Sequence, residues 1–383
     1  MSNSLAIVEK PDHVCYRYRV RAFEPALARR GVAIETFPLP KNSLVRLVQF
    51  ARLSQFDSVL IQRKLLSRVE LKLLRRIAGR LLFDFDDAVF HRDSYDSRGP
   101  SSRKRAKRFR ATMEMADTVI AGNDYLADMA SKAGARADRI VVIPTCIATE
   151  LYARPIPPKP AREGIELVWV GSSSTLRGLE ARRNLFDRLV DEIPGIKLRV
   201  VCDRFPNLGA LPIVEVPWNE ATEAAEIAKG DVGISWIPDD PWSRGKCGLK
   251  ILQYQAAGLP VLANPVGVHP EMIQPGRNGW LPETDDDWVE AVKHLAANPA
   301  LRDEMGNNAR REVETGYSVA AWEETFVATL RGSTSFDEAR GVPFDLRRDR
   351  GRQPFRQLGA IGGQVKDSPW ITDNHSGRIE VHG

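Results

Sequence analysis

The sequence predicts an α/β protein with two Rossmann-like domains that face each other across a cleft. Segments typical of β-strands alternate with segments of helical periodicity, this alternation runs along the chain twice, and a proline-rich stretch separates the two rounds. Strands that alternate with helices form parallel sheets covered on both faces. Because such sheets bind ligands at the carboxyl ends of their strands, we expect the functional site in the cleft.

The first domain is predicted over residues 1–153. Apolar residues at helical spacing, such as Val20, Phe23 and Leu27, mark its first helix, and Gly31 supplies a stop signal. The expected strands are 4–9, 32–39, 58–63, 81–87, 118–122 and 139–144. The expected helices are 16–31, 43–54, 67–79, 108–116 and 124–134.

The second domain is predicted over residues 165–315, after a linker at 154–164 that is rich in proline and charge. Its expected strands are 165–171, 197–203, 213–218, 231–238 and 260–264, and its expected helices include 179–193, 220–230, 286–298 and 299–316. A terminal helix at 316–331 is expected to pack back toward the first domain. Periodicity then ends, so 332–383 are predicted to be a disordered or loosely docked tail.

Composition places the chain among ordinary globular proteins, with 43% hydrophobic and 27% charged residues and a net charge of +5. No apolar run approaches the roughly 20 residues of a membrane-spanning helix, and no signal peptide is recognisable. We therefore expect a cytoplasmic protein, with peripheral attachment at the inner membrane as an open alternative. The four cysteines lack metal-binding spacing and are expected to be reduced thiols.

A basic run at 103–110 contains six Lys or Arg residues in eight positions. Such a run is either a solvated surface or a contact for polyanions. If the basic run binds a partner, we expect an anionic membrane surface or an acidic acceptor. Nucleic acid is not expected.

Two lysines, Lys246 and Lys250, stand four positions apart in the stretch SRGKCGLKILQYQAAGLPV, residues 243–261. If a helix starts near Gly245 or Lys246, the two lysines lie one turn apart on the same face, near the start of the helix. Free N–H groups, the positive end of the helix dipole, two ammonium groups and the preceding Arg244 then form an anion site that suits a diphosphate. The alternative is that both lysines extend from a buried helix into water.

A second loop is expected at the same edge of the second sheet. The strand at 165–171 ends in Gly171, and Ser172, Ser173, Ser174 and Thr175 follow it. Small hydroxyl residues at the first strand-to-helix turn can bind phosphate or simply cap the helix. The loop contains neither GxGxxG nor a P-loop motif, which argues against a nicotinamide or P-loop nucleotide site.

Polar residues also follow the fourth strand of the first domain, in LLFDFDDAVFHRD. Asp86, Asp87 and His91 are the candidate catalytic residues, because they should reach the cleft and contact a sugar or an acceptor hydroxyl; the alternative is that the carboxylates cap a turn. Arg17 and Arg19 stand at the start of the predicted first helix; because alternate residues of a helix cannot all face one way, we expect Arg17 or Arg19 in the preceding loop, pointing into the cleft. The alternative for both arginines is an ordinary surface position.

The segment KCGLKILQYQAAGLPVLANPVGVHPEMIQPGRNGWL resembles the donor-binding segment of GT-B glycosyltransferases, specifically the family 4 or group 1 enzymes. YRYRVRAFEPALARRGV, LLFDFDDAVF, VIAGNDYLA and VVIPT resemble acceptor-domain segments of bacterial members. The resemblance covers roughly residues 5–330. It implies a nucleoside diphosphate sugar donor and a glycan or lipid-linked acceptor, with Asn123 on the acceptor side.

One feature of the family is missing. Members usually carry a Glu-x7-Glu pair, and the corresponding positions here are Gly245 and Gln253. Gln253 can still bind a ribose hydroxyl, whereas sugar contacts must come from Asp239, Asp240 or backbone groups near Val266 and Gly267. The resemblance thus implies a donor site of Gly171, Ser172, Ser173, Ser174, Thr175, Arg244, Lys246, Gly248, Lys250, Gln253, Val266, Gly267 and Glu271.

The resulting hypothesis is a glycosyltransferase that needs no metal or other cofactor. Lysines would stabilise the leaving diphosphate, and in a retaining enzyme a departing phosphate oxygen could take the acceptor proton. An inverting enzyme would need Asp86, Asp87 or His91 as general base. Two alternatives stay open: a catalytically silent GT-B protein that binds a nucleotide sugar or glycan as a scaffold, and a polyanion binder led by residues 103–110.

Overall fold

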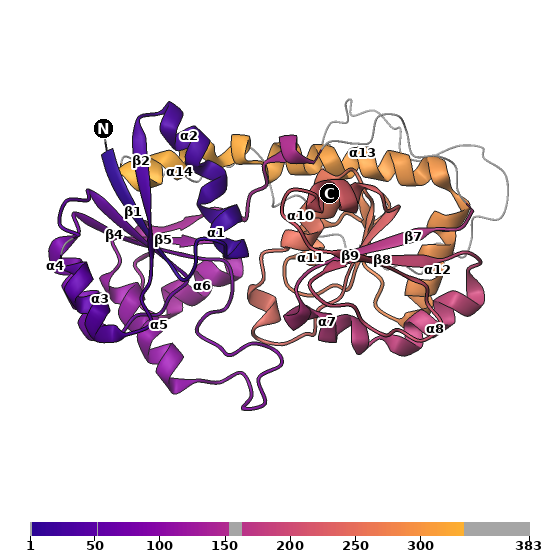
Figure 1. Ribbon diagram of the computed structural model, residues 1–383, viewed down its shortest axis with the longest axis horizontal. Helices are drawn as coiled ribbons and strands as arrows, with labels where there is room; N and C mark the ends of the chain where they lie inside the picture. Colours follow the sequence, from indigo (N-terminus) through magenta and orange to yellow (C-terminus); the bar gives the residue numbers. More distant parts are fainter. Residues whose placement is uncertain (1, 52, 153–162, 333–383) are drawn as a thin grey trace, which may run out of the picture.

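The computed structural model describes residues 2–51, 53–152 and 163–332. Two parallel sheets, each flanked by helices, lie in separate halves of the molecule (Figure 1). Most of the predicted linker at 154–164, and all of the predicted tail beyond Gly332, lie outside the described residues. Within the described residues, no helix has the length and apolar character needed to cross a bilayer.

The N-terminal sheet has six parallel strands in the order β2-β1-β3-β4-β5-β6. Their bounds are β1 Ser2–Val8, β2 Val32–Pro38, β3 Ser58–Gln62, β4 Arg80–Phe85, β5 Thr118–Ala121 and β6 Ile140–Val142. Side chains alternate between the two faces: Leu5 and Ile7 pack under one helical layer, Ala6 and Val8 under the other. Both faces are therefore buried, as expected for parallel strands.

Helices α3 (Ser43–Phe50), α4 (Arg68–Ile77), α5 (Arg103–Met115) and α6 (Asp124–Lys132) cover one face of this sheet. The other face is covered by α1 (Val14–Arg19), η1 (Arg21–Phe23), α2 (Glu24–Arg29) and α14 (Val319–Arg331). Two short 3₁₀ turns, η2 (Ala137–Arg139) and η3 (Thr149–Leu151), flank the last strand.

The C-terminal sheet has the order β12-β11-β10-β7-β8-β9. Its strands are β7 Glu166–Val170, β8 Lys197–Cys202, β9 Ile213–Pro217, β10 Val232–Ser235, β11 Val261–Ala263 and β12 Gly279–Trp280. Its helices are α7 Ser173–Glu180, α8 Arg183–Glu192, α9 Glu223–Ala228, α10 Leu249–Ala256, α11 His269–Met272, α12 Asp285–Ala297 and α13 Pro299–Gly316, with the 3₁₀ turn η4 at Ser243–Gly245.

Several predicted helix bounds are wrong for local reasons. The single helix expected at 16–31 is broken, because Val20 leaves the helical region and Pro25 has no N–H for helix continuation. The helix expected at 108–116 starts at Arg103, because the Ser102 hydroxyl caps it by accepting from Arg105 N. The basic run therefore forms the first turns of α5. The helix expected at 179–193 is two helices, α7 and α8.

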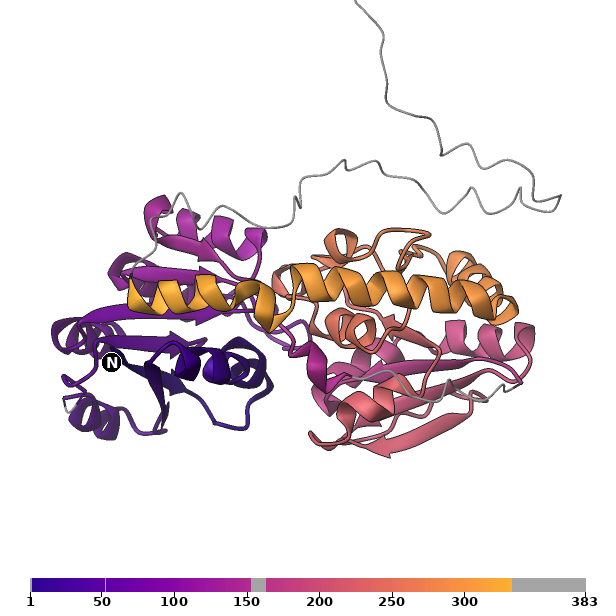
Figure 2. The same ribbon diagram turned by 90° about the horizontal axis from the view of Figure 1, so that it is seen from above.

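The last helix, α14, belongs to the core of the N-terminal domain. Figure 2 shows α13 and α14 in line along the molecule, so that α14 reaches the first sheet. Trp322, Phe326, Val327 and Leu330 pack into the face that α2 also covers. The Phe326 ring stacks on Phe23, with centroids 4.3 Å apart.

Phe326→Ala is expected to lower the free energy of unfolding of the N-terminal domain by about 3–5 kcal/mol, because it removes a fully buried ring. Urea denaturation measures the change. Leu44→Ala is the control: its side chain is 73% exposed, so its effect should stay within about 0.5 kcal/mol. Equal losses in the two variants would contradict this packing.

Candidate active site

The two domains meet where the carboxyl edge of the first sheet faces residues 243–248 of the second domain. Asn123 caps α6 and its amide nitrogen donates to the carbonyl oxygens of Gly245 (3.4 Å) and Lys246 (3.2 Å). At Gly245 an added Cβ would lie 2.7 Å from Ala88 Cβ and 2.8 Å from Ala88 N. Residue 245 therefore has no room for a side chain, which accounts for glycine at a position where the resembled family carries glutamate.

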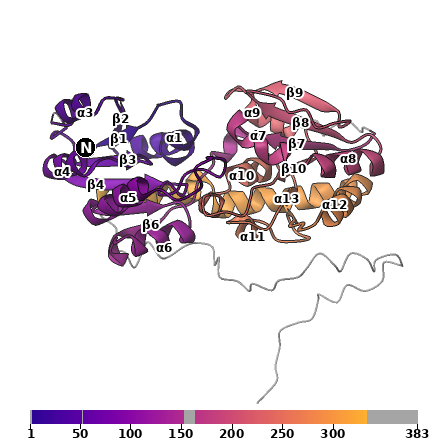
Figure 3. The ribbon, with the colours of Figure 1, turned by 90° about the horizontal axis from the view of Figure 1, so that it is seen from below.

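A second polar contact joins the domains near α1 and α10, which lie on the sides that face each other (Figure 3). The amide nitrogen of buried Gln253 donates to the hydroxyls of Tyr18 (3.0 Å) and Tyr152 (3.2 Å). Arg17 forms an ion pair with Glu223 of α9 at 2.7 Å. The structure thus engages Gln253 and Arg17 in interdomain contacts, and Arg17 lies within α1 instead of the preceding loop.

Lys246 and Lys250 lie close enough to repel each other, but only Lys250 belongs to the helix. Helix α10 starts at Leu249, and its N-cap Gly248 has a left-handed backbone (φ +66°), so Lys246 precedes the helix. The predicted helix start at 245 or 246 is wrong, because this glycine conformation interrupts the chain there. Lys250 Nζ lies 3.4 Å from Thr175 Oγ1 and 4.7 Å from the centroid of the Trp169 ring.

Gly171 provides the space for Lys250. A Cβ on Gly171 would lie 2.7 Å from Lys250 Nζ and 2.9 Å from Thr175 Oγ1. Burial of the lysine lowers its pKa to about 7, and repulsion from Lys246 adds to this effect. In the described ranges, neither lysine forms an ion pair with a carboxylate. The two ammonium groups therefore make an electropositive spot that favours an anion.

His269, in α11, does not add a charge to this spot. Burial, together with a smaller effect of the nearby lysines, lowers its pKa to about 4, although the hydrogen bond that its Nδ1–H donates to the Asn264 carbonyl (2.8 Å) opposes the change. The turn before α11 packs beside η4, because a Cβ on Gly267 would lie 3.2 Å from the Ser243 carbonyl oxygen. Val266 is buried in this turn, and Glu271 is exposed on α11.

The loop of Ser172, Ser173, Ser174 and Thr175, called the serine loop below, already binds a carboxylate of the protein itself. The Asp203 carboxylate, after β8, accepts from the backbone N–H and the hydroxyl of Ser173, both at 2.7 Å. Ser172 and Ser174 are bonded to each other through their hydroxyls at 2.8 Å. Ser173 is thus not free for phosphate in this state, whereas Thr175 lies next to Lys250. Arg244 is likewise paired, with Asp239 at 2.8 Å.

The acceptor-side carboxylates form a cluster with Arg63, which directly follows β3. The Arg63 guanidinium lies 2.6 Å from Asp87 and 3.4 Å from Asp86, and also donates to Cys15 Sγ. Arg63 is the non-glycine residue with a left-handed backbone (φ +61°) among those described. Such strain is typical of residues held in place at functional sites.

The two aspartates differ in their pKa. Burial would raise the pKa of Asp86, but Arg63 and Arg19 outweigh it and hold this pKa below its usual value. Burial and the charge of Asp86 raise the pKa of Asp87, although Arg63 and Lys246 oppose the rise. Asp87 is therefore the carboxylate suited to carry a proton, and it faces Lys246 across the domain junction.

Cys15, Asp86 and Asp87 have ligand atoms within 4.8 Å of one another, a spacing that could hold a metal ion. Arg63 contacts all three of these side chains. A guanidinium already neutralises the cluster, so the residues do not suit a further cation. Independence from metal nevertheless remains a prediction.

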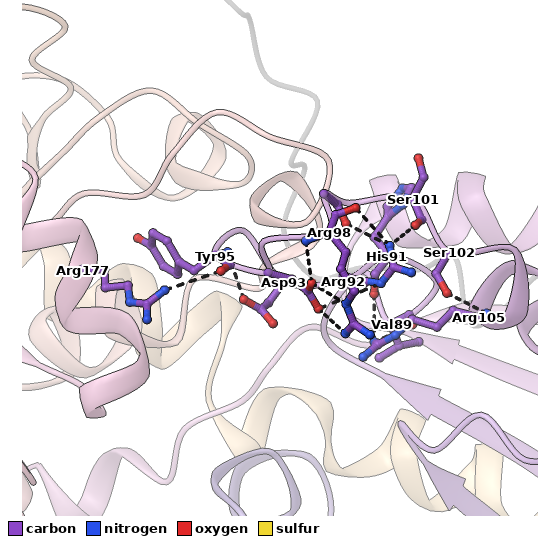
Figure 4. A network of polar contacts seen from close by, with 12 residues as sticks. Val89, His91, Arg92, Asp93, Tyr95, Arg98, Ser101, Ser102, Arg105 and Arg177 are labelled. Carbon is purple, nitrogen blue, oxygen red and sulfur yellow. Dashed lines mark hydrogen bonds and ion pairs between the residues drawn. The ribbon is translucent and has the colours of Figure 1, made fainter.

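Two predicted site residues lie elsewhere. Arg19 is buried, pairs with Asp84 (Nε to Oδ1 3.1 Å) and donates to the Ile143 carbonyl, so the prediction that it points into the cleft is wrong. His91 lies on the loop that follows β4 (Figure 4). No hydrogen bond or ion pair joins His91 to Asp86 or Asp87 in the described part of the chain. Burial lowers the pKa of His91.

The loop that carries His91 crosses to the second domain. Ser94 Oγ lies 3.0 Å from Ser243 Oγ. Figure 4 shows the second contact, in which Arg177 of α7 donates to the Tyr95 carbonyl at 3.5 Å. The loop thus links the acceptor side to both donor-side segments, η4 and α7.

Sequence reasoning missed Arg63, Cys15, Asp203 and Glu223. Arg63 directly follows β3 and Asp203 directly follows β8, so the rule that selected Asp86, a polar residue after a strand, would have found both. Cys15 and Glu223 lie in helices; Cys15 contacts Arg63 within the first domain, and Glu223 contacts Arg17 across the junction, so both depend on long-range packing.

Comparison with known proteins supports the fold. Residues 182–328 match a family model described as glycosyl transferase-like. The chain is similar to sucrose-phosphate synthase from Thermosynechococcus elongatus (18% identity, TM-score 0.69, 87% of this chain and 99% of that one). It is also similar to Anabaena HepE, solved with UDP and glucose (16%, TM-score 0.62, 87% and 100%). The chain thus has the GT-B fold, with two Rossmann-like domains.

Curated relatives match shorter parts. D-inositol 3-phosphate glycosyltransferase of Actinosynnema mirum is 24% identical over 275 residues, 64% of this chain and 63% of that protein. The protein of the same name from Nocardioides sp. is 34% identical over 85 residues, which are 22% of this chain and 18% of that protein. The chain therefore covers less than two thirds of the length of these relatives.

Gly245→Ala is expected to weaken the closed domain contact, because the new methyl group meets the backbone of Ala88. Overpacking of this kind costs about 1–3 kcal/mol, which shifts the balance between closed and open forms by roughly 5-fold to 150-fold. Small-angle scattering should show a larger radius of gyration. Gly316→Ala is the control, since a Cβ there meets no atom within 4 Å; identical scattering of both variants would argue against the contact.

Lys250 should take up a proton when an anion binds. With a pKa of about 7, it is largely neutral near pH 8, and a bound diphosphate raises its pKa, so the affinity for a nucleoside diphosphate should fall up to about tenfold per pH unit above pH 7. Calorimetry in two buffers of different ionisation enthalpy measures the uptake. Lys250→Met should abolish it, and an unchanged uptake in that variant would refute the assignment.

Proposed function

We propose that this protein is a glycosyltransferase that moves a hexosyl group from a nucleoside diphosphate sugar to a glycan or lipid-linked acceptor. The observation that carries the proposal is the pair of lysines, Lys246 and Lys250, which form no ion pair with a carboxylate in the described residues and lie at the domain junction of a GT-B fold. The glycosyl transferase-like match over 182–328 contains both lysines. The names of the relatives and the UDP-bound neighbour support the same donor class.

In this proposal the second domain holds the donor. Lys250, beside Thr175 and Gly171, and Lys246 bind the diphosphate, and their charges stabilise the leaving group as its negative charge grows. Gly245 provides no carboxylate for the sugar, so Asp240 or backbone groups at Val266 and Gly267 make those contacts. No metal is required for a leaving group that two ammonium groups already neutralise.

The first domain holds the acceptor near Asp86 and Asp87. With retention, a phosphate oxygen of the leaving diphosphate takes the acceptor proton, and Asp87 only orients the hydroxyl. With inversion, Asp87 is the candidate general base, because burial and the charge of Asp86 raise its pKa. We favour retention, in line with the family 4 resemblance.

A second candidate function follows from Gly245 and Ala88. Because their close contact leaves no space for the glutamate that the resembled family carries, the protein could bind a nucleotide sugar or glycan without turnover and act as a scaffold. Both functions require nucleotide binding, and only the first requires release of a nucleoside diphosphate.

A thermal-shift screen with UDP, GDP and ADP tests nucleotide binding, because a ligand of the native state raises the melting temperature. Lys246→Met/Lys250→Met should weaken binding at least a hundredfold, given about 1.5 kcal/mol or more for each charge-assisted contact. Arg311→Met, on the exposed side of α13, is the control. No shift at millimolar nucleotide would overturn the donor site.

Turnover decides between enzyme and scaffold. Release of nucleoside diphosphate from the sugar donor that binds supports transfer or hydrolysis, and NMR of the product distinguishes retention from inversion. Binding without release, over a panel of glycan and lipid-linked acceptors, would favour the scaffold.

A further inference from the structure

Large apolar side chains are exposed mainly at one place on the N-terminal domain. Of the seven exposed large hydrophobic residues that the structure describes, four lie on α3 and at the start of α4: Leu44, Val45, Val48 and Val69. Leu44 is 73% exposed and Val69 is 65% exposed. Leu44 and Val48 are one helical turn apart, so α3 turns an apolar stripe to the outside while Phe50 is buried beneath it.

Basic side chains adjoin this apolar stripe. On α4, exposed Lys72 and Arg76 follow Val69 at helical spacing and lie on the same side of the helix. On α5, Arg103, Lys107 and Arg110 follow the same spacing, and all three are exposed. None of these five cations has an ion-pair partner among the residues the structure covers.

The remaining arginines of the basic run behave differently. Arg105 donates to the His91 carbonyl at 2.9 Å, and Arg108 donates to the Leu65 carbonyl at 3.1 Å. These two side chains hold α5 against the domain. The unpaired positions are thus the ones left for an external partner.

Helices α3, α4 and α5 form one continuous surface, because they cover the same face of the N-terminal sheet and contact one another in sequence order (Figure 1). Arg46 joins α3 to Glu70 of α4 at 3.3 Å, and Arg68 joins α4 to Glu114 of α5 at 3.9 Å. We call the outer side of these three helices the α3–α5 face.

We propose that the α3–α5 face docks this protein on an anionic lipid bilayer. A bilayer surface offers both things that the face lacks: negative charge for the unpaired cations, and an apolar layer beneath the headgroups for Leu44, Val48 and Val69. Nucleic acid would match the charge, but a phosphate backbone gives no apolar layer for three aliphatic side chains. The combination of the two residue classes on one surface favours lipid.

The position of the face matters for any substrate held in the bilayer. Each of the three helices follows a parallel strand, so each begins at the carboxyl edge of the sheet, where Asp86, Asp87 and Arg63 lie. Leu44, Val69 and Arg103 stand at these helix starts. Docking therefore brings the acceptor side of the cleft close to the lipid surface. The docking proposal does not depend on the proposed transfer activity.

Vesicle sedimentation of the full chain tests the proposal, with vesicles of phosphatidylcholine alone and of phosphatidylcholine with phosphatidylglycerol. Binding is expected only to the anionic vesicles and should weaken as salt is raised above about 0.1 M. Each basic residue near an anionic membrane contributes about 1 kcal/mol, so Arg103→Gln/Lys107→Gln should reduce the partition coefficient by roughly thirtyfold. Leu44→Ser/Val69→Ser should weaken binding at all salt concentrations.

The matched control is Lys197→Gln/Arg311→Gln, which removes the same charge from exposed positions of the second domain. Its partition coefficient should stay near that of the unaltered chain, and equal losses in both charge variants would overturn the docking face. Unchanged melting temperatures and nucleotide-induced shifts confirm that each variant is folded. Absence of vesicle binding, or binding to RNA that depends on Arg103 and Lys107 while anionic vesicles are ignored, would also overturn the proposal.

Discussion

The close fit of residues 245–247 against the carboxyl edge of the N-terminal sheet is the contact on which the rest of the site depends. Gly245 allows this approach because it presents no side chain to Ala88, and the Asn123 amide fixes the two carbonyl groups beside it. Lys246 follows directly, so this contact sets where its ammonium group stands relative to Asp87. Gly248 then turns the chain into α10 and brings Lys250 to the serine loop. One backbone contact thus places charges that belong to different domains.

Pairing of charges distinguishes structural from functional cations at the junction. Arg17, Arg63 and Arg244 each face a carboxylate within hydrogen-bonding distance, and those pairs hold segments together. Among the residues that the structure describes, Lys246 and Lys250 form no such ion pair; burial lowers the pKa of Lys250 to about 7, and repulsion from Lys246 adds to this effect. An uncompensated pair of like charges is unfavourable unless a ligand relieves it. The same reasoning applies to the α3–α5 face, where cations without partners stand beside uncovered aliphatic groups.

The strand and helix alternation predicted both sheets except the two-residue strand β12, because it depends on local periodicity. The helix break at Val20 and the late start of α10 after Gly248 escaped prediction, since they follow from the backbone conformations of these two residues. Among site residues, Asp86 and Asp87 could be placed at a strand end, and the structure puts them there. Arg19 could not be placed correctly, because its burial depends on Asp84 and on a carbonyl from the distant β6–η3 segment. Long-range packing, not propensity, decided each of these cases.

The position of α14 has a consequence for biosynthesis. Phe326 and its neighbours are among the last described residues that a ribosome would add, yet they complete the core of the domain that is made first. The emerging N-terminal domain must therefore keep the apolar surface of Phe23 and Leu27 uncovered while the entire second domain is translated. Domains otherwise tend to fold in the order of synthesis. For this chain, the final folding step of the first domain waits until α14 has been translated, and the apolar surface around Phe23 and Leu27 needs protection in the interval.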